Sequence, residues 1–244
     1  STLLRLIGST GGKSFEMIAE YRARGCDIVL EVSPLHLLFD TSMTDEDPEL
    51  WTKIQMNPAI QAPGHRKALI KGLKDGFIQF IATDHAPHTE EEKYSAFKKY
   101  MAEYGGTSPI ETAAIIKQKD SQLFYKICVE NNHSGAPWVD TYGLVCTWLM
   151  KVHKFTPQEI ARVSAYLPGA YVNRFLKTQF PKGKFGKGFG QIAPGFVGSL
   201  TVLNTKTETT VRREDLKTKV GWSALEGRVM PGGVEAVFVR GTKY

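Results

Sequence analysis

A chain of 244 residues with 42% hydrophobic and 23% charged residues can bury a substantial core, in one large domain or a domain and a half. No apolar run approaches the roughly 18 residues that cross a bilayer, and the N-terminal residues lack the basic-then-apolar order of a signal peptide. Cys26, Cys128 and Cys146 are widely spaced and form no motif. They argue against a disulfide framework and favour a reducing compartment, so we expect a cytoplasmic protein without a membrane partner.

The net charge of +6 raises the question of nucleic-acid binding. Lys and Arg are scattered along the chain, and the densest cluster is KGKFGKG at residues 182–188, with a single aromatic residue. Such a cluster is typical of a basic turn in solvent. We therefore expect no nucleic-acid partner.

In chain order, the first half alternates buried strands with helices. The apolar patterns predict strands over 3–7, 26–32 and 77–82, and helices over 13–25 and 66–76. The acidic stretch at 40–49 reads as a charged loop. Strand, helix and strand in this order predict an α/β fold with a parallel sheet, whose working residues lie at the carboxyl ends of the strands.

The second half of the chain has a different pattern of polar and apolar residues. Residues 94–133 are polar and rich in helical patterns, without recognisable chemistry. From about residue 190, short alternating segments at 198–204, 209–215 and 235–244 lie between Gly, Pro and Asn turns. They predict a small C-terminal antiparallel β unit.

The glycine-rich stretch LLRLIGSTGGKS at residues 3–14 resembles a phosphate-binding loop. That motif requires four residues between its first glycine and Gly12-Lys13-Ser14, which places the first glycine at position 7, where this sequence has Ile7. Starting instead from Gly8 leaves the loop one residue short, so its amides would not point to one phosphate. The nucleotide-binding alternative is therefore the weakest of those considered.

A stronger signal follows the third predicted strand. ATDHAPHTEEEK, at residues 82–93, brings Asp84, His85 and His88 into five positions at the end of a buried strand. Carboxylate and imidazole groups there are the components of a hydrolytic metal site, because oxygen and nitrogen ligands suit zinc and a carboxylate can carry a proton.

TDHAPHTEEEK resembles the signature of dihydroorotases, which are cyclic amidohydrolases of pyrimidine biosynthesis. Further segments resemble the family in the same order along the chain: LEVSPLHLLFD (30–40), MNPAI (56–60), SGAPWVDT (134–141), GQIAPGFVGSLTVLN (190–204) and VGWSALEGRVMPGGVEAVFVRG (220–241). Hydantoinases and dihydropyrimidinases share the architecture, but the DHAPH form favours dihydroorotase.

The resemblance covers the C-terminal portion of the family and implies its fold. Residues 1–188 are expected to form the later part of a (β/α)8 TIM-type barrel, with a helical insertion at about 94–133. Residues 189–244 are expected to form a C-terminal β-sandwich segment.

Site roles also follow from the resemblance. Asp84 would be a metal ligand and the catalytic group that accepts a proton from the attacking water and donates it to the leaving nitrogen. His88 would bind the carboxylate of the substrate, dihydroorotate or carbamoyl aspartate. Asn57 and the backbone around Ser134 and Gly135 would hold the pyrimidine ring.

Supporting roles are implied for three further residues. His85 would be a hydrogen-bond partner rather than a ligand, and Glu31 and His36 would lie behind the site, although His36 could equally cap its loop. The remaining histidines need no function. The family further implies one or two zinc ions and a homodimer.

The departures from the family pattern are as specific as the matches. The sequence contains no His-x-His, the motif that opens the family's barrel with metal ligands, and Ile7 stands where the family's sixth strand supplies a histidine. Most zinc ligands are therefore missing from this sequence, and we expect it to be part of a longer polypeptide.

Two hypotheses remain. The chain is either the C-terminal portion of an active dihydroorotase or a non-catalytic, dihydroorotase-like scaffold that has lost its metal centre. Asp84, Asn57 and His88 favour the first hypothesis; Ile7 and the absent His-x-His favour the second.

Overall fold

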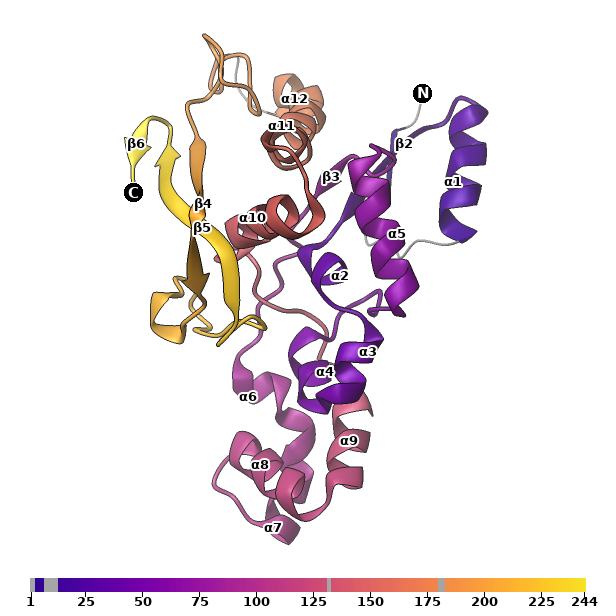
Figure 1. Cartoon of the computed structure of the whole chain (residues 1–244), viewed down its shortest axis with the longest axis vertical. Helices are drawn as coiled ribbons and strands as arrows, with labels where there is room; N and C mark the ends of the chain where they lie inside the picture. The colour runs from indigo at the N-terminus through magenta and orange to yellow at the C-terminus, as the bar shows by residue number, and fades with distance from the viewer. Residues whose placement is uncertain (1–2, 7–12, 131–132, 180–182) are drawn as a thin grey trace.

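The computed structural model describes residues 3–6, 13–130, 133–179 and 183–244. Figure 1 shows three regions: a parallel sheet with its helices, a helical lobe at one end, and a C-terminal antiparallel sheet. The predicted glycine loop and Ile7 lie outside the described residues.

The parallel sheet has the order β1-β2-β3. It consists of β1 (Leu3–Leu6), β2 (Asp27–Val32) and β3 (Phe80–Ile81). Helix α1 (Lys13–Ala23) connects the first two strands, as the sequence predicts. The central strand β2 is buried along almost its whole length, which is typical of a parallel sheet covered on both faces.

The third strand is shorter than the predicted range of 77–82 because its first residues close the preceding helix, α5 (Pro63–Lys74). The Ile78 amide donates to the carbonyl of Gly72 in that helix. Pairing with β2 begins only where the Gln79 amide donates to Leu30.

The acidic stretch at 40–49 is helical, so its interpretation as a loop was wrong. After the buried α2 (Pro34–Leu38) come α3 (Thr41–Glu46) and α4 (Pro48–Ile54). Asp40 caps α3 by accepting from the Ser42 amide, and Pro48 occupies the first turn of α4.

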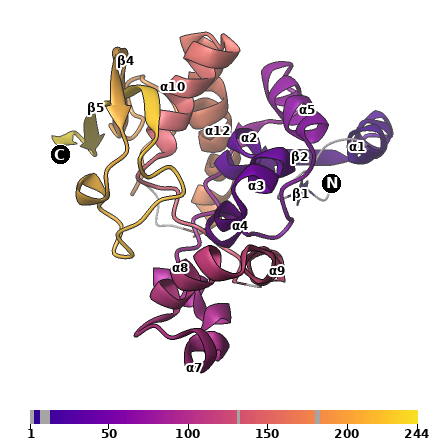
Figure 2. The same ribbon diagram turned by 60° about the horizontal axis from the view of Figure 1, so that its bottom comes forward.

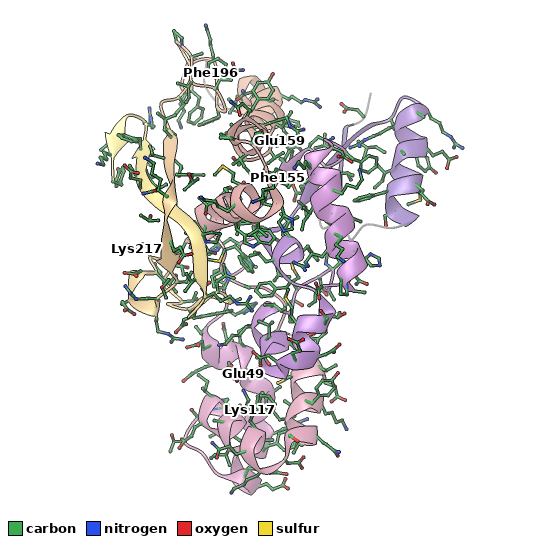
Figure 3. All side chains as sticks on the ribbon, in the orientation of Figure 1. Glu49, Lys117, Phe155, Glu159, Phe196 and Lys217 are labelled. Atoms are coloured by element: carbon green, nitrogen blue, oxygen red, sulfur yellow. The ribbon has the colours of Figure 1, made fainter. Side chains whose placement is uncertain are left out.

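The helical lobe spans the polar segment after the DHAPH motif and has its own apolar core around Phe97, Ile116 and Phe124. Its elements are α6 (Glu90–Lys93), η1 (Ser95–Tyr100), α7 (Met101–Tyr104), α8 (Pro109–Lys119) and α9 (Ser121–Glu130). Glu49 of α4 joins the lobe to the rest of the chain, since it pairs with Lys117 at 2.8 Å (Figure 3). It also accepts from the Tyr94 hydroxyl.

Helix α10 (Tyr142–His153) lies between the two sheets, with β5 packed against it on one side (Figures 1 and 2). Its residues belong to both large apolar clusters: Val145 packs with Trp138 and Trp222, whereas Leu149 packs with Leu30 of β2. The helices α11 (Pro157–Ala161), η2 (Arg162–Tyr166) and α12 (Leu167–Gln179) follow.

The C-terminal sheet is antiparallel in the order β4-β5-β6. It consists of β4 (Leu200–Thr210), β5 (Val229–Val239) and β6 (Thr242–Lys243). The separate strand predicted at 209–215 was wrong. β4 continues through register shifts as far as Thr210, and Arg213–Asp215 forms the short helix η3.

Arg22 of α1 ties the helix to the sheet. Its guanidinium donates to the carbonyls of Ile28 (2.8 and 3.0 Å) and Phe77 (2.9 Å) and to the Gln79 side chain (2.7 Å). We expect Arg22→Met to lower the free energy of unfolding by about 3 kcal/mol, because charged hydrogen bonds to partly buried acceptors are lost.

The matched control is Arg24→Met just past the end of the same helix, where the guanidinium pairs with the exposed Glu20 and lies over the ring of the exposed Tyr21. It should cost less than about 0.5 kcal/mol in urea denaturation. Equal losses in the two variants would contradict the role assigned to Arg22.

Candidate active site

Asp84 follows the carboxyl end of β3 and is exposed. Its φ of 46° places it in the left-handed region, which aspartate adopts more readily than most side chains. Such a conformation costs about 1–3 kcal/mol and clusters at active sites, where the surrounding structure holds it.

The loop after Asp84 pairs with a segment about fifty residues further along the chain. His85 forms a parallel bridge with Ala136, and the Ala86 amide donates to the Ala136 carbonyl at 3.3 Å. His85 Nδ1 accepts from the amides of Trp138 (3.0 Å) and Val139 (3.3 Å). Since Nδ1 is the acceptor, the ring proton of neutral His85 lies on Nε2. The imidazole therefore fixes the loop to the backbone.

His88 connects the same two segments at their other end. Its Nε2 donates to the Ser134 carbonyl at 3.0 Å, and Nδ1 lies 3.4 Å from a Glu92 carboxylate oxygen. The indole of the buried Trp222 donates to the His88 carbonyl at 2.7 Å. Both the ring and the backbone of His88 are thus held.

A third loop, which precedes α5 in sequence and contains Asn57, also contacts Ser134. Asn57 Nδ2 donates to the Ser134 hydroxyl at 3.0 Å, and the Gly135 amide donates to the Gln55 carbonyl at 2.8 Å. The peptide bond between Asn57 and Pro58 is cis. The structure therefore brings Asn57, His88, Ser134 and Gly135 together.

Glu31 and His36 lie deeper, at 4% and 3% exposure. His36 Nε2 lies 2.9 Å from the Pro58 carbonyl, and Nδ1 lies 3.0 Å from the Ser33 hydroxyl. Burial lowers the pKa of His36, while the Pro58 carbonyl and the negative charge of Asp84 act in the opposite direction. The charge of Asp84 therefore acts on the His36 imidazole, which also contacts the Asn57–Pro58 loop through the Pro58 carbonyl.

A zinc site requires at least three converging ligands. Among the described residues, no three His, Cys, Asp or Glu side chains lie together in a way that could hold a metal ion. Asp84 brings one carboxylate, while His85 Nδ1 and both nitrogens of His36 have hydrogen-bond partners in the protein. These side chains do not fit a zinc centre on their own.

Sequence reasoning gave no role to three residues that support the site. Lys93 is the last residue of the TDHAPHTEEEK motif and is fully buried. Trp222 holds His88, and Arg213 forms a two-pronged pair with Glu90, at 2.7 Å to each oxygen. Lys93 and Trp222 stand within segments that resemble dihydroorotases, but no local pattern indicates partners so distant in sequence.

Solved structures with this architecture belong to the amidohydrolases. An L-hydantoinase from Arthrobacter aurescens superimposes with a TM-score of 0.70 at 17% identity, over 98% of this chain and 44% of that chain. A D-hydantoinase from Thermus sp. gives 0.70 at 18% identity, over 99% and 44%. The α/β amidohydrolase fold predicted from the sequence is confirmed.

The sequence relatives are more specific, although no protein-family model matches the chain. A dihydroorotase from Bacillus subtilis is 48% identical over 38% of this chain, and one from Brevibacillus brevis is 30% identical over 82%. One from Pediococcus pentosaceus is 28% identical over 94%. The resemblance to dihydroorotases is thus confirmed. The chain spans 21%, 36% and 43% of these relatives, respectively.

Gly135 lies in close contact with the loop that follows Asp84. With φ of 125°, a Cβ on this residue would stand 2.5 Å from the Ala86 carbonyl oxygen and 3.3 Å from the His88 ring. We expect Gly135→Ala to lower the free energy of unfolding by more than about 3 kcal/mol, because backbone strain adds to a backbone clash.

Gly105→Ala serves as the control, since its φ is also positive (84°) but nothing lies within 4 Å of the added Cβ. Strain alone should cost about 1–2 kcal/mol there. Urea denaturation of both variants separates the two effects; a Gly135 variant no less stable than the Gly105 variant would count against the close approach of the loops.

Proposed function

We propose that this chain supplies the proton-transfer and ring-binding part of a dihydroorotase-like cyclic amidohydrolase, which interconverts dihydroorotate and carbamoyl aspartate. The observation that carries this proposal is the convergence of Asn57, His88 and Ser134 at the loop that begins with Asp84, directly after β3. Parallel α/β folds place their active sites at this end of the strands.

Asp84 is the proposed acid–base group. In hydrolysis, the oxygen of water bonds to the ring amide carbon, the carbon–nitrogen bond breaks, and the water proton goes through the Asp84 carboxylate to the leaving nitrogen. Formation of the ring reverses these steps. An exposed carboxylate held in one backbone conformation suits this proton transfer, because it is both accessible and fixed in position.

Three groups are proposed to bind the substrate. The imidazole of His88, whose Nε2 lies 3.0 Å from the Ser134 carbonyl and whose Nδ1 lies 3.4 Å from Glu92, is proposed to bind the carboxylate of the substrate. Asn57 and the backbone of Ser134 and Gly135 are proposed to hold the ring amides.

Zinc dependence, implied by the resemblance, stays a proposal with Asp84 as the candidate ligand. We also propose that residues 1–188 form the later part of a (β/α)8 barrel and that residues 189–244 form a β-sandwich segment. A role in pyrimidine biosynthesis, a homodimer and a cytoplasmic location are further proposals from the same resemblance. None of the described helices is long and apolar enough to cross a membrane.

The non-catalytic scaffold is not favoured, because the curated relatives are named dihydroorotases and the structural neighbours are hydantoinases. Its motivating residue, Ile7, lies outside the described residues.

Replacement of Asp84 tests the function. In the complete polypeptide that carries this sequence, Asp84→Asn should lower kcat for dihydroorotate hydrolysis by at least about 100-fold, because the amide cannot carry the proton. The change is isosteric, and asparagine also tolerates a positive φ, so the fold should persist. The measurement is the loss of dihydroorotate at steady state.

Asp75→Asn is the control, an exposed carboxylate at the C-terminal end of α5 that pairs with Lys71. It should leave kcat within about 2-fold. Full activity in the Asp84 variant would rule out the proposed chemistry, and an inactive wild-type polypeptide would revive the scaffold hypothesis.

A further inference from the structure

Lys93 is a buried cation beside the candidate active site. It is the last residue of α6, where the chain enters the helical lobe, and its exposed fraction is 0%. Lysine is almost never fully buried unless its ammonium has partners. The position therefore calls for a reason beyond packing.

The Lys93 ammonium donates to two backbone carbonyls in the segment that follows the lobe in sequence. Nζ lies 3.0 Å from the Gly135 oxygen and also donates to the His133 oxygen. Burial lowers the pKa of Lys93 to about 8, so the group is still largely charged at neutral pH. Charge-assisted hydrogen bonds of this kind are about twice as strong as neutral ones.

The two carbonyls flank Ser134. That residue also receives hydrogen bonds from Asn57 at its hydroxyl and from His88 at its carbonyl. Its segment is therefore held by three side chains, those of Asn57, His88 and Lys93.

Lys93 also joins the entry and the exit of the helical lobe, since the lobe lies between Lys93 and His133 in sequence. Loss of the Lys93 hydrogen bonds would weaken the base of the lobe, which His85 and His88 also hold, and would loosen the segment that contains Ser134.

We propose that Lys93 is a positioning residue, which holds the His133 and Gly135 carbonyls so that the Ser134–Gly135 backbone stays where the substrate binds. The inference rests on the proposed function. Lys93 itself touches neither substrate nor reacting atoms. Its loss should therefore weaken binding more than it slows the chemical step.

The test uses Lys93→Met in the complete polypeptide, which keeps the apolar stem and removes the donors. The KM for dihydroorotate should rise at least 10-fold, while kcat changes by less than 3-fold. In hydrogen exchange, the amides of residues 133–139 should exchange at least 10-fold faster.

Lys117→Met is the matched control. It removes another lysine contact of the lobe, the pair with Glu49, without touching the 133–135 carbonyls. KM and the exchange of residues 133–139 should stay within 2-fold of wild type. Lys93→Gln, which keeps an uncharged NH₂ donor group, should give an intermediate KM and replaces the Met variant if that does not fold.

Unchanged KM and exchange in both Lys93 variants would overturn the proposal, as would equal effects of Lys93→Met and Lys117→Met. Loss of kcat with KM unchanged would also overturn it. An inactive wild-type polypeptide would instead contradict the proposed function, and the exchange measurement would still decide whether Lys93 holds the segment.

Discussion

The candidate site depends on one set of contacts: the backbone-directed hydrogen bonds between the loop after β3 and the segment that leaves the helical lobe. His85 and His88 each bind that segment through a ring nitrogen, and Ala86 binds it through its amide. Of the side chains of Asp84, His85 and His88, the two imidazoles thus form hydrogen bonds with backbone groups. Only Asp84 stays exposed.

The rest of the fold supports this junction from outside. The C-terminal region reaches it through Trp222, which binds the His88 carbonyl, and through Arg213, which pairs with both Glu90 and Glu226. Exposed ion pairs contribute little individually, so the buried indole is the stronger of these links. Because α10 packs against both sheets, the C-terminal sheet and the strand that carries the site form one continuous structure.

The sequence predicted the position of Asp84 because local patterns suffice for it: an apolar run ends, and a polar motif follows. The acidic helices at 40–54 were missed because their composition suggests solvent exposure, although Asp40 and Pro48 are helix-start signals. The contacts of Lys93 could not be predicted, because its carbonyl partners are about forty residues away in sequence, on the other side of the helical lobe. In addition, every residue has a backbone carbonyl, so the residue types at 133 and 135 do not indicate an acceptor for a lysine.

The central claim is that these three loops form one binding site for a cyclic amide. A crystal structure of the complete polypeptide with dihydroorotate tests it most directly. The account predicts the ring amide beside Asp84, the substrate carboxylate at His88, and hydrogen bonds from the ring to Asn57 and the Ser134–Gly135 backbone. Dihydroorotate bound away from these residues would contradict it.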